Sequence, residues 1–271
     1  MANQFDLSGK TALLTGGTGA LGTAMARGLL AAGARVGLLS RNPDNLLSAK
    51  EELGGQAGDV ILLRGDVTDA DSLRDAARQI RQQWGKLDIL VNAAGGNRPG
   101  ATIGPDQSFF DLSIEDFAGV SKLNLDGTVI PSLIFGKLIT ENGSGCIVNI
   151  SSMAAERAIT RVVGYSAAKA GIDNFTRWLA VEMARKYEGK VRVNAIAPGF
   201  FIGEQNRRLL LNEDESLTER GKTIIRNTPM GRFGRADELV TTLVYLCADA
   251  SSFVTGIVVP VDGGFSAFSG V

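Results

Sequence analysis

The chain has 271 residues, 44% of them hydrophobic and 21% charged, and its 28 basic and 29 acidic side chains give a net charge of −1. This balance argues against nucleic acid or an anionic membrane as a partner, and no apolar run reaches the roughly 18 residues that span a bilayer. There is no histidine, and Cys146 and Cys247 fit no metal-ligand or redox spacing, so we expect no metal site and two packed thiols.

Short apolar runs alternate along the chain with segments of helical periodicity. The runs that favour strands are residues 11–15, 36–39, 60–63, 89–91, 146–150, 191–196 and 257–259. The segments that favour helices are residues 20–32, 45–53, 71–84, 113–139, 163–187 and 237–248, with Asp71 and Ser113 as N-caps and a kink at Pro131. Continuously apolar strands are typical of a sheet buried on both faces. The alternation therefore predicts an α/β fold with a parallel sheet and right-handed crossovers.

Two segments interrupt this alternation. Residues 95–112 are rich in glycine and proline, and residues 199–235 are longer, charged and contain a helical stretch at 204–211. Both follow predicted strands, and ligands of open α/β sheets bind beyond the carboxyl ends of the strands. We therefore expect one domain over residues 1–271, with residues 199–235 covering a substrate. The N-terminus lacks the basic and apolar regions of a signal peptide, which predicts a cytoplasmic protein.

A glycine-rich turn at residues 15–22 follows the first predicted strand and begins the first predicted helix. Glycines let the backbone turn sharply and approach a pyrophosphate, while the helix N-terminus offers N–H groups and positive potential. Gly17, Gly19 and Gly22 match the G-x-G-x-x-G spacing of dinucleotide sites. The sequence predicts such a site, with an ordinary tight turn as the alternative. The expected contacts are Gly16, Thr18, Gly19, Ala20, Leu21 and Gly22.

The end of the second predicted strand bears on the choice of dinucleotide. An NAD site usually has an acidic residue there for the ribose hydroxyls. Here the position is occupied by Ser40 and Arg41. A guanidinium suits a 2′-phosphate, which favours NADP(H), with NAD(H) as the second choice. The alternative interpretation of Arg41 is a solvated loop residue.

Tyr165 and Lys169 form a candidate acid/base pair in a chain without histidine. Residues i and i+4 share a helix face, so the Lys169 ammonium is expected near the Tyr165 phenol. A cation within about 4–6 Å lowers a pKa by about 1–3 units from the ordinary phenol value of about 10, provided that it outweighs burial. Ser152, upstream of the pair, is a third candidate. The alternative is a tyrosine and a lysine on the surface of a helix.

These motifs together resemble the short-chain dehydrogenase/reductase family over essentially the whole chain. The matching residues are the glycine-rich turn, Asp66, residues 92–95, Asn124, Ser152, Tyr165 with Lys169, Pro198 with Gly199, and residues 262–264. Two positions depart from the pattern: Ala20 replaces a usual glycine, and Gly203 replaces a common cofactor-contacting threonine. The resemblance implies a Rossmann-like doubly wound parallel sheet of about seven strands with helices on both faces. It also implies a nicotinamide-dependent oxidoreductase that is commonly a homotetramer.

The resemblance also implies residue roles. Tyr165 is then the general acid/base, Lys169 lowers its pKa and holds the nicotinamide ribose, and Ser152 orients the substrate oxygen. Asn124 supports a water-mediated proton relay, and Asp66 and Asn92 lie on the adenine side. The other implied cofactor contacts are Val67, Ala93, Gly95, Pro198, Gly199 and Phe201.

Stretches in and around the two irregular segments are similar to the D-mannonate oxidoreductase (fructuronate reductase) branch of this family, which interconverts D-mannonate and D-fructuronate. They are residues 96–102, 109–112, 199–201 with 204–207, 218–221, 228–234 and 264–271. The carboxylate of a sugar acid matches the planar fork of arginine. The candidates are Arg98, Arg157, Arg161 and Arg207, with Asn97 and Asn206 for sugar hydroxyls. The alternatives are a gluconate 5-dehydrogenase, a 3-oxoacyl-acyl-carrier-protein reductase and, more remotely, a nucleotide-binding sensor without turnover.

Overall fold

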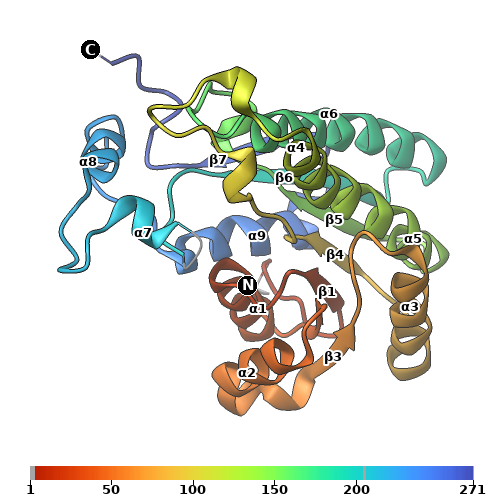
Figure 1. Cartoon of the computed structure of the whole chain (residues 1–271). Helices are drawn as coiled ribbons and strands as arrows, with labels where there is room; N and C mark the ends of the chain where they lie inside the picture. The colour runs from red at the N-terminus through yellow and green to blue at the C-terminus, as the bar shows by residue number, and fades with distance from the viewer. Residues whose placement is uncertain (1–3, 204–205, 271) are drawn as a thin grey trace.

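A parallel sheet organises the protein, whose computed structural model describes residues 4–203 and 206–270. Within these residues seven strands pair in the order β3-β2-β1-β4-β5-β6-β7, and every neighbouring pair is parallel (Figure 1). The strands are β1 (Thr11–Thr15), β2 (Arg35–Ser40), β3 (Val60–Arg64), β4 (Ile89–Asn92), β5 (Gly145–Ile150), β6 (Val191–Pro198) and β7 (Val258–Val261). This topology confirms the predicted doubly wound sheet.

Helices connect the strands and cover both faces of the sheet. They are α1 (Ala20–Ala31), α2 (Pro43–Leu53), α3 (Ala70–Trp84), α4 (Ile114–Ser121), α5 (Gly127–Glu141), α6 (Val163–Lys186), α7 (Arg207–Leu210), α8 (Glu219–Arg226) and α9 (Val240–Cys247). Their bounds follow the predicted segments closely, apart from residues 113–139 and 204–211. The start of the latter, Glu204, lies outside the described residues.

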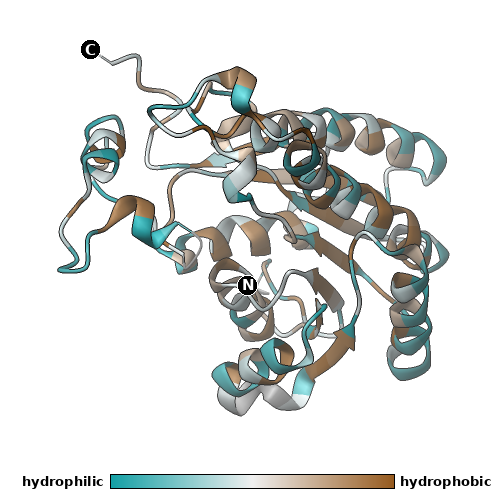
Figure 2. Ribbon diagram, viewed as in Figure 1, coloured by the Kyte–Doolittle hydropathy of each residue, from teal (hydrophilic) through white to brown (hydrophobic). Residues whose placement is uncertain are grey.

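Side chains of β1 alternate between two apolar cores, one on each face of the sheet. Ala12 and Leu14 pack with α1, α2 and α9, whereas Leu13 packs with α3, α5 and α6. Figure 2 shows that the strands are mainly hydrophobic, whereas surface helices such as α3 are largely hydrophilic. Because both faces are buried, the strands lack the polar alternation of an exposed sheet, and this makes them recognisable as continuous apolar runs.

Two N-caps were predicted, and one of them is wrong. Ser113 caps α4, since its hydroxyl accepts a hydrogen bond from the Asp116 N–H at 3.1 Å. Asp71 is instead a first-turn residue of α3, and the cap is Asp69, whose carboxylate accepts from the Asp71 N–H at 3.0 Å. Both aspartates are suited to a helix start, as cap and as a negative charge at the positive end of the dipole. The extended backbone at Asp69 decides between them.

The predicted helix over residues 113–139 contains a π-helical turn at Lys122–Asp126 that separates α4 from α5. Asn124 lies in this turn, and its side-chain amide donates to the Val120 carbonyl at 2.9 Å. That carbonyl would accept a backbone N–H in a regular α-helix, so the side chain inserts into the hydrogen-bond ladder. The irregularity lies upstream of Pro131, which is buried within α5.

The irregular segment after β6 contains α7 and α8, which pack as a pair. A Cβ at Gly221 of α8 would lie 2.4 Å from the Leu210 carbonyl oxygen, so the close approach of the two helices requires glycine. In the part of the chain that the structure describes, no helix is long and apolar enough to cross a membrane.

Candidate active site

The carboxyl ends of β1 and β4 meet at the switch point of the sheet, where chain connections leave in opposite directions. Gly16 follows β1 with a φ of +65°, and a Cβ there would lie 2.8 Å from backbone atoms of Ala94, which follows β4. A Cβ at Gly22 would lie 2.3 Å from the Gly16 carbonyl oxygen. The turn is therefore a bare backbone cradle at the start of α1, and it fits a dinucleotide pyrophosphate.

Further predicted contacts flank the cradle. Gly19 is the N-cap of α1 without a side-chain cap, so the N–H groups of the following residues Ala20 and Leu21 remain for a ligand. The Thr18 hydroxyl lies 3.4 Å from that of Ser40 at the end of β2. These positions bring the glycine-rich turn and the end of β2 together, as the sequence predicts.

Arg41 extends from the end of β2 into solvent, with 70% of its side chain exposed. Its guanidinium lies 3.8 Å from the carboxylate of Asp66, which also accepts hydrogen bonds from the backbone and hydroxyl of Thr68 at 2.8 Å. An exposed pair at this distance is weak. Arg41 is therefore free to turn toward a ligand, whereas Asp66 is held in place. The neighbouring Val67 is buried against Gly127 of α5.

The loop after β4 combines structural and candidate binding positions. The backbone N–H groups of Ala93 and Ala94 both donate to the Thr15 hydroxyl at 3.2 Å. The Asn92 side chain points into the interior, where it donates to Ser132 and Asn149 at 2.9 Å. The predicted adenine-side contact of Asn92 is therefore left to its backbone, because the side chain is buried.

β6 ends at Pro198, and the chain continues through Gly199 and Phe201. Gly199 donates to the Val261 carbonyl at 3.0 Å, and a Cβ there would lie 2.7 Å from the Cα of Asp262. The Phe201 ring packs on Gly234 and is buried. Phe201 thus anchors the start of the irregular segment, and its predicted cofactor contact remains a prediction.

The four predicted catalytic residues converge beside this loop. The Lys169 ammonium is almost fully buried and donates to the Ile150 carbonyl at 2.7 Å. A Cβ at Gly95 would lie 3.4 Å from this ammonium and 2.6 Å from Asn124 Oδ1, so glycine lets both groups approach. Asn124 also bonds to Gly96 in both directions, at 2.7 and 3.2 Å. The π-helical turn thereby fastens the loop after β4 at a place beside the lysine.

Ser152 and Tyr165 complete the cluster. Ser152 follows β5 and caps a short 3-10 turn, accepting from the Ala154 N–H at 3.1 Å. Tyr165 lies in the first turn of α6, is half-buried, and hydrogen-bonds to the Ser152 side chain. The Lys169 ammonium lies over the Tyr165 ring, 5.4 Å from its centroid. A phenol, a hydroxyl and a buried ammonium thus face one region.

The prediction that the pKa of Tyr165 is lowered is wrong in this structure. Burial raises the pKa of Tyr165 above its ordinary value, and the hydrogen bond with Ser152 opposes this only in part. The ammonium lies over the ring and bonds to Ile150 rather than to the phenol oxygen. Burial also lowers the pKa of Lys169 itself to about 8. Desolvation therefore outweighs the attraction that sequence spacing suggested.

Asp173 is a functional candidate that sequence reasoning missed. It follows Lys169 by one helical turn on α6, is buried, and accepts a hydrogen bond from the Ser151 hydroxyl. Burial raises the pKa of Asp173, and its charge in turn raises the pKa of Lys169 against desolvation. The i, i+4 spacing from Lys169 was the available signal, but a carboxylate on a helix is usually solvated.

The predicted substrate residues are scattered over the loops around the cluster, and most have partners within the chain. Asn97 donates to Thr102 at 2.8 Å, and Asn206 bonds to Phe201 and Gly203 at 2.8 Å. Arg98 lies 3.9 Å from Asp116, Arg207 lies 2.6 Å from Glu215, and Arg157 donates to the Ser266 carbonyl. Arg161 precedes α6 and donates to none of these groups.

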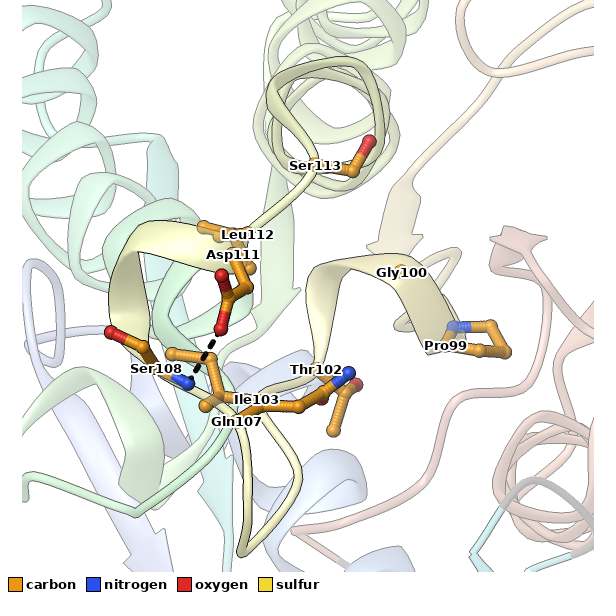
Figure 3. Close-up of a pocket in the computed structure, with 9 residues that line it drawn as sticks. All are labelled: Pro99, Gly100, Thr102, Ile103, Gln107, Ser108, Asp111, Leu112 and Ser113. Atoms are coloured by element: carbon orange, nitrogen blue, oxygen red, sulfur yellow. Dashed lines mark hydrogen bonds between the residues drawn. The ribbon is translucent and has the colours of Figure 1, made fainter.

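Two cavities lie near these loops without including the catalytic cluster. One of about 130 Å³ is enclosed by residues 99–113, where Asp111 accepts from the Ser108 N–H at 2.9 Å (Figure 3). The other, of about 330 Å³, lies beyond β6 and β7 and is lined by Phe200, Phe201 and Asp262 among others. Ligand sites usually have about 300–1,000 Å³, so the first is too small for a dinucleotide. The candidate site is therefore defined by the cradle and by the predicted catalytic residues rather than by a cavity.

Comparison with known proteins agrees with this geometry. A sequence model described as "Enoyl-(Acyl carrier protein) reductase" matches residues 17–266. The uncharacterized oxidoreductase UxuB of Bacillus subtilis is 45% identical, over 98% of each chain. A Haemophilus influenzae structure with bound NAD, provisionally described as a D-mannonate oxidoreductase, is 38% identical with a TM-score of 0.90 over 98% of each chain. The chain belongs to the short-chain dehydrogenase/reductase family.

As a short-chain dehydrogenase/reductase, the protein is an oxidoreductase that uses a nicotinamide cofactor. A third relative is a gluconate 5-dehydrogenase from Burkholderia cenocepacia in complex with NADP and tartrate. It is 29% identical with a TM-score of 0.86, over 97% of this chain and 98% of that one. The relatives thus include one chain with NAD and one with NADP.

The dehydrogenase should depend on Asp173 through the charge of Lys169. Asp173→Asn keeps an acceptor for Ser151 but removes the charge that raises the Lys169 pKa, so that pKa should fall below about 8. Lys169 carries its charge below its pKa; a lower pKa therefore removes the charge at lower pH. We expect the alkaline limb of the kcat/KM profile for carbonyl reduction to move to lower pH.

The measurement is the pH dependence of kcat/KM for wild type and Asp173→Asn. The matched control is Asp71→Asn, which removes an exposed carboxylate on α3 and should leave the limb in place. An alkaline limb that is unchanged in Asp173→Asn, or shifted to higher pH, would contradict the coupling between Asp173 and Lys169.

Proposed function

We propose that this enzyme interconverts D-fructuronate and D-mannonate by hydride transfer. The observation that carries the proposal is the likeness to the NAD-bound Haemophilus protein, which extends over 98% of both chains and so includes the irregular segments where substrates bind. Membership of the family establishes that the protein is an oxidoreductase. The proposal concerns the identity of its substrate. A gluconate 5-dehydrogenase is the second candidate, favoured by the Burkholderia relative.

The catalytic cluster suits the reduction of a ketone. A bound nicotinamide supplies the hydride. Tyr165, kept neutral by its raised pKa, donates its phenolic proton to the substrate oxygen, and the Ser152 hydroxyl donates a hydrogen bond to the same oxygen. Lys169 is positively charged below about pH 8, and it stabilises the phenolate that remains. Asn124 holds the loop after β4 against the lysine, and its part in a proton relay is included in the proposal.

The direct test is a nicotinamide absorbance assay with a panel of substrates. We expect D-fructuronate to be reduced with the highest kcat/KM, ahead of 5-ketogluconate and a 3-oxoacyl thioester. Preference for 5-ketogluconate would transfer the assignment to gluconate 5-dehydrogenase, and preference for the thioester would transfer it to an acyl-carrier-protein reductase. Dinucleotide binding without reduction of any carbonyl would instead favour the sensor.

NADP(H) is the proposed cofactor because Arg41 occupies the end of β2 without a strong partner. We expect wild type to use NADPH in preference to NADH. Arg41→Ala should lower kcat/KM for NADPH by roughly 10–100-fold, since a charge-assisted hydrogen bond contributes about 1.5–3 kcal/mol, and leave NADH nearly unchanged. The measurement is kcat/KM for both dinucleotides at a saturating substrate concentration.

Arg27→Ala is the matched control for this variant. Arg27 is an exposed arginine of α1 that pairs with Glu52 at 3.1 Å. Its removal should leave kcat/KM unchanged for both NADPH and NADH. Two results would overturn the assignment of Arg41 to a 2′-phosphate. One is a wild type that prefers NADH, and the other is an Arg41→Ala variant whose kcat/KM falls equally for NADPH and NADH.

A homotetramer is the proposed assembly. Large apolar side chains are exposed on α5 and α6, among them Leu133 at 70%, Trp178 at 62% and Val181 at 58%. Such exposure marks a surface suited to a second copy of the chain. Sedimentation equilibrium tests this directly, and a monomer at micromolar concentration would contradict it. We also propose that the chain forms a single domain in which residues 199–235 cover the substrate. The proposed location is the cytoplasm.

A further inference from the structure

Arg161 differs from the other arginines that the sequence singled out for a substrate carboxylate. Arg98, Arg157 and Arg207 are each engaged by another group of the chain. Across residues 4–203 and 206–270, Arg161 forms no ion pair, although it lies on the loop between Ser152 and Tyr165. Its guanidinium is therefore available to a ligand at the edge of the catalytic cluster.

Arg161 has a strained backbone conformation, and a hydrogen bond to the first irregular segment holds it in place. Its φ is +80°, in the left-handed region that residues with a side chain seldom adopt. The Arg161 carbonyl accepts a hydrogen bond from the Ile103 N–H at 3.0 Å, which ties it to the first irregular segment. Strained backbone of this kind clusters at ligand sites, where the surroundings hold it in position.

A second arginine approaches Arg161 from the other irregular segment. Arg220 of α8 is half-buried, and its guanidinium donates to the hydroxyl of Thr160, the residue before Arg161, at 3.4 Å. Burial and the charge of Arg161 both lower the pKa of Arg220. The adjacent Glu219 does not neutralise Arg220, because it pairs with Lys222 at 2.7 Å.

Two like charges that are partly withdrawn from water and lack a counter-ion repel one another, and an anion between them removes this cost. The location suits a substrate. Arg161 precedes Tyr165 by four residues, so their Cα atoms lie within about 14 Å of each other. Arg220 belongs to the segment that is proposed to cover the substrate. One arginine therefore comes from the loop that leads to the catalytic tyrosine, and the other from the cover.

We propose that Arg161 and Arg220 together bind the carboxylate of the substrate, a proposal that rests on the sugar-acid function above. Each planar guanidinium presents paired donors that match the two oxygens of a carboxylate. Binding of the acid group draws α8 and residues 160–161 together and directs the distant carbonyl toward Tyr165. A neutral ketose lacks the group that bridges them, so the pair selects for acids.

The test compares Arg161→Gln, Arg220→Gln and Arg220→Lys with wild type in D-fructuronate reduction. The matched control is Arg226→Gln, which removes an exposed arginine from the far end of the same helix. We expect each glutamine variant to raise KM for D-fructuronate by about tenfold or more, with kcat changed by no more than about threefold. Arg220→Lys should recover part of the loss, and the control should match wild type. The dissociation constant of the dinucleotide should be the same in all of them.

A structural role for these arginines would lower thermal stability and dinucleotide affinity together, so both are measured in parallel. An unchanged KM in both glutamine variants, or parallel losses in dinucleotide affinity, would overturn the proposal. If wild type does not reduce D-fructuronate, the proposed function fails, but the pair is still tested by calorimetric titration of tartrate into the dinucleotide complex. Tartrate binding that is lost in both variants then supports the pair, and binding equal to wild type, or none in wild type, rejects it.

Discussion

Replacement of Tyr165 by phenylalanine is expected to lower kcat by about 100-fold to 10,000-fold, the usual contribution of a positioned proton donor. The phenyl ring preserves the packing beneath the Lys169 ammonium, 5.4 Å from the ring centroid. What disappears is the hydroxyl, its proton and its hydrogen bond with Ser152. The loss should therefore fall on turnover, and dinucleotide affinity should change by less than about threefold. The measurement is kcat by absorbance, with the dissociation constant obtained from quenching of protein fluorescence.

Tyr245→Phe on α9 is the matched control, since it removes a partly exposed hydroxyl on a helix of the core facing β1, away from the cluster. It should keep wild-type kcat and affinity. If Tyr165→Phe retained turnover within about tenfold of wild type, Tyr165 would not be the proton donor. The assignment would then pass to another group of the cluster, and the proposed mechanism would have to be abandoned.

Replacement of Gly22 by alanine is expected to weaken dinucleotide binding by roughly 10–100-fold and to lower thermal stability as well. The added Cβ would lie 2.3 Å from the Gly16 carbonyl oxygen and 2.8 Å from the Gly17 Cα. These are backbone atoms of the turn, which cannot rotate away, so the cradle must open. Overpacking of this kind costs about 1–3 kcal/mol. The measurements are the melting temperature of the protein alone and the dissociation constant of the dinucleotide.

Gly19→Ala separates the two effects. Its Cβ would come no closer than 3.8 Å to the Gly16 carbonyl oxygen, so the protein alone should be as stable as wild type. If the pyrophosphate approaches this turn, the same Cβ should still reduce dinucleotide affinity. Gly58→Ala, in open space, should change neither quantity. Wild-type affinity in both Gly22→Ala and Gly19→Ala would remove the dinucleotide from this turn.

Local chemistry made the fold predictable. The five residues of β1 are all buried, so both faces of the strand show in the sequence as one apolar run. Gly16 in the turn after β1 and Gly22 in the first turn of α1 leave no room for a Cβ, and the sequence records this requirement as closely spaced glycines. The start of α3 was misplaced because Asp69 and Asp71 are equally suited to a helix N-terminus. Asp69 is the N-cap because its backbone is extended, and the residue type alone does not encode that conformation.

The structure brings the predicted catalytic residues together, but their electrostatics differ from the prediction. The spacing of Tyr165 and Lys169 correctly indicated a shared helix face, and the ammonium does lie over the ring. The direction of the Tyr165 pKa shift depends on burial by segments distant in sequence, and this reversed the prediction. Asp173 shows the same dependence, since only burial distinguishes it from a solvated helix carboxylate.

The sequence by itself determined the parallel α/β fold and the family, and it predicted the glycine-rich turn and the candidate catalytic residues, because these follow from short-range patterns of apolar, glycine and polar residues. Only the tertiary structure decided the sign of the tyrosine pKa shift, the hydrogen bonds between Asn124 and Gly96 and the approach of Arg220 to the loop that contains Arg161. Each of these depends on desolvation or contact between segments that are far apart in the chain. Such effects arise when the segments fold together, and no local spacing records them.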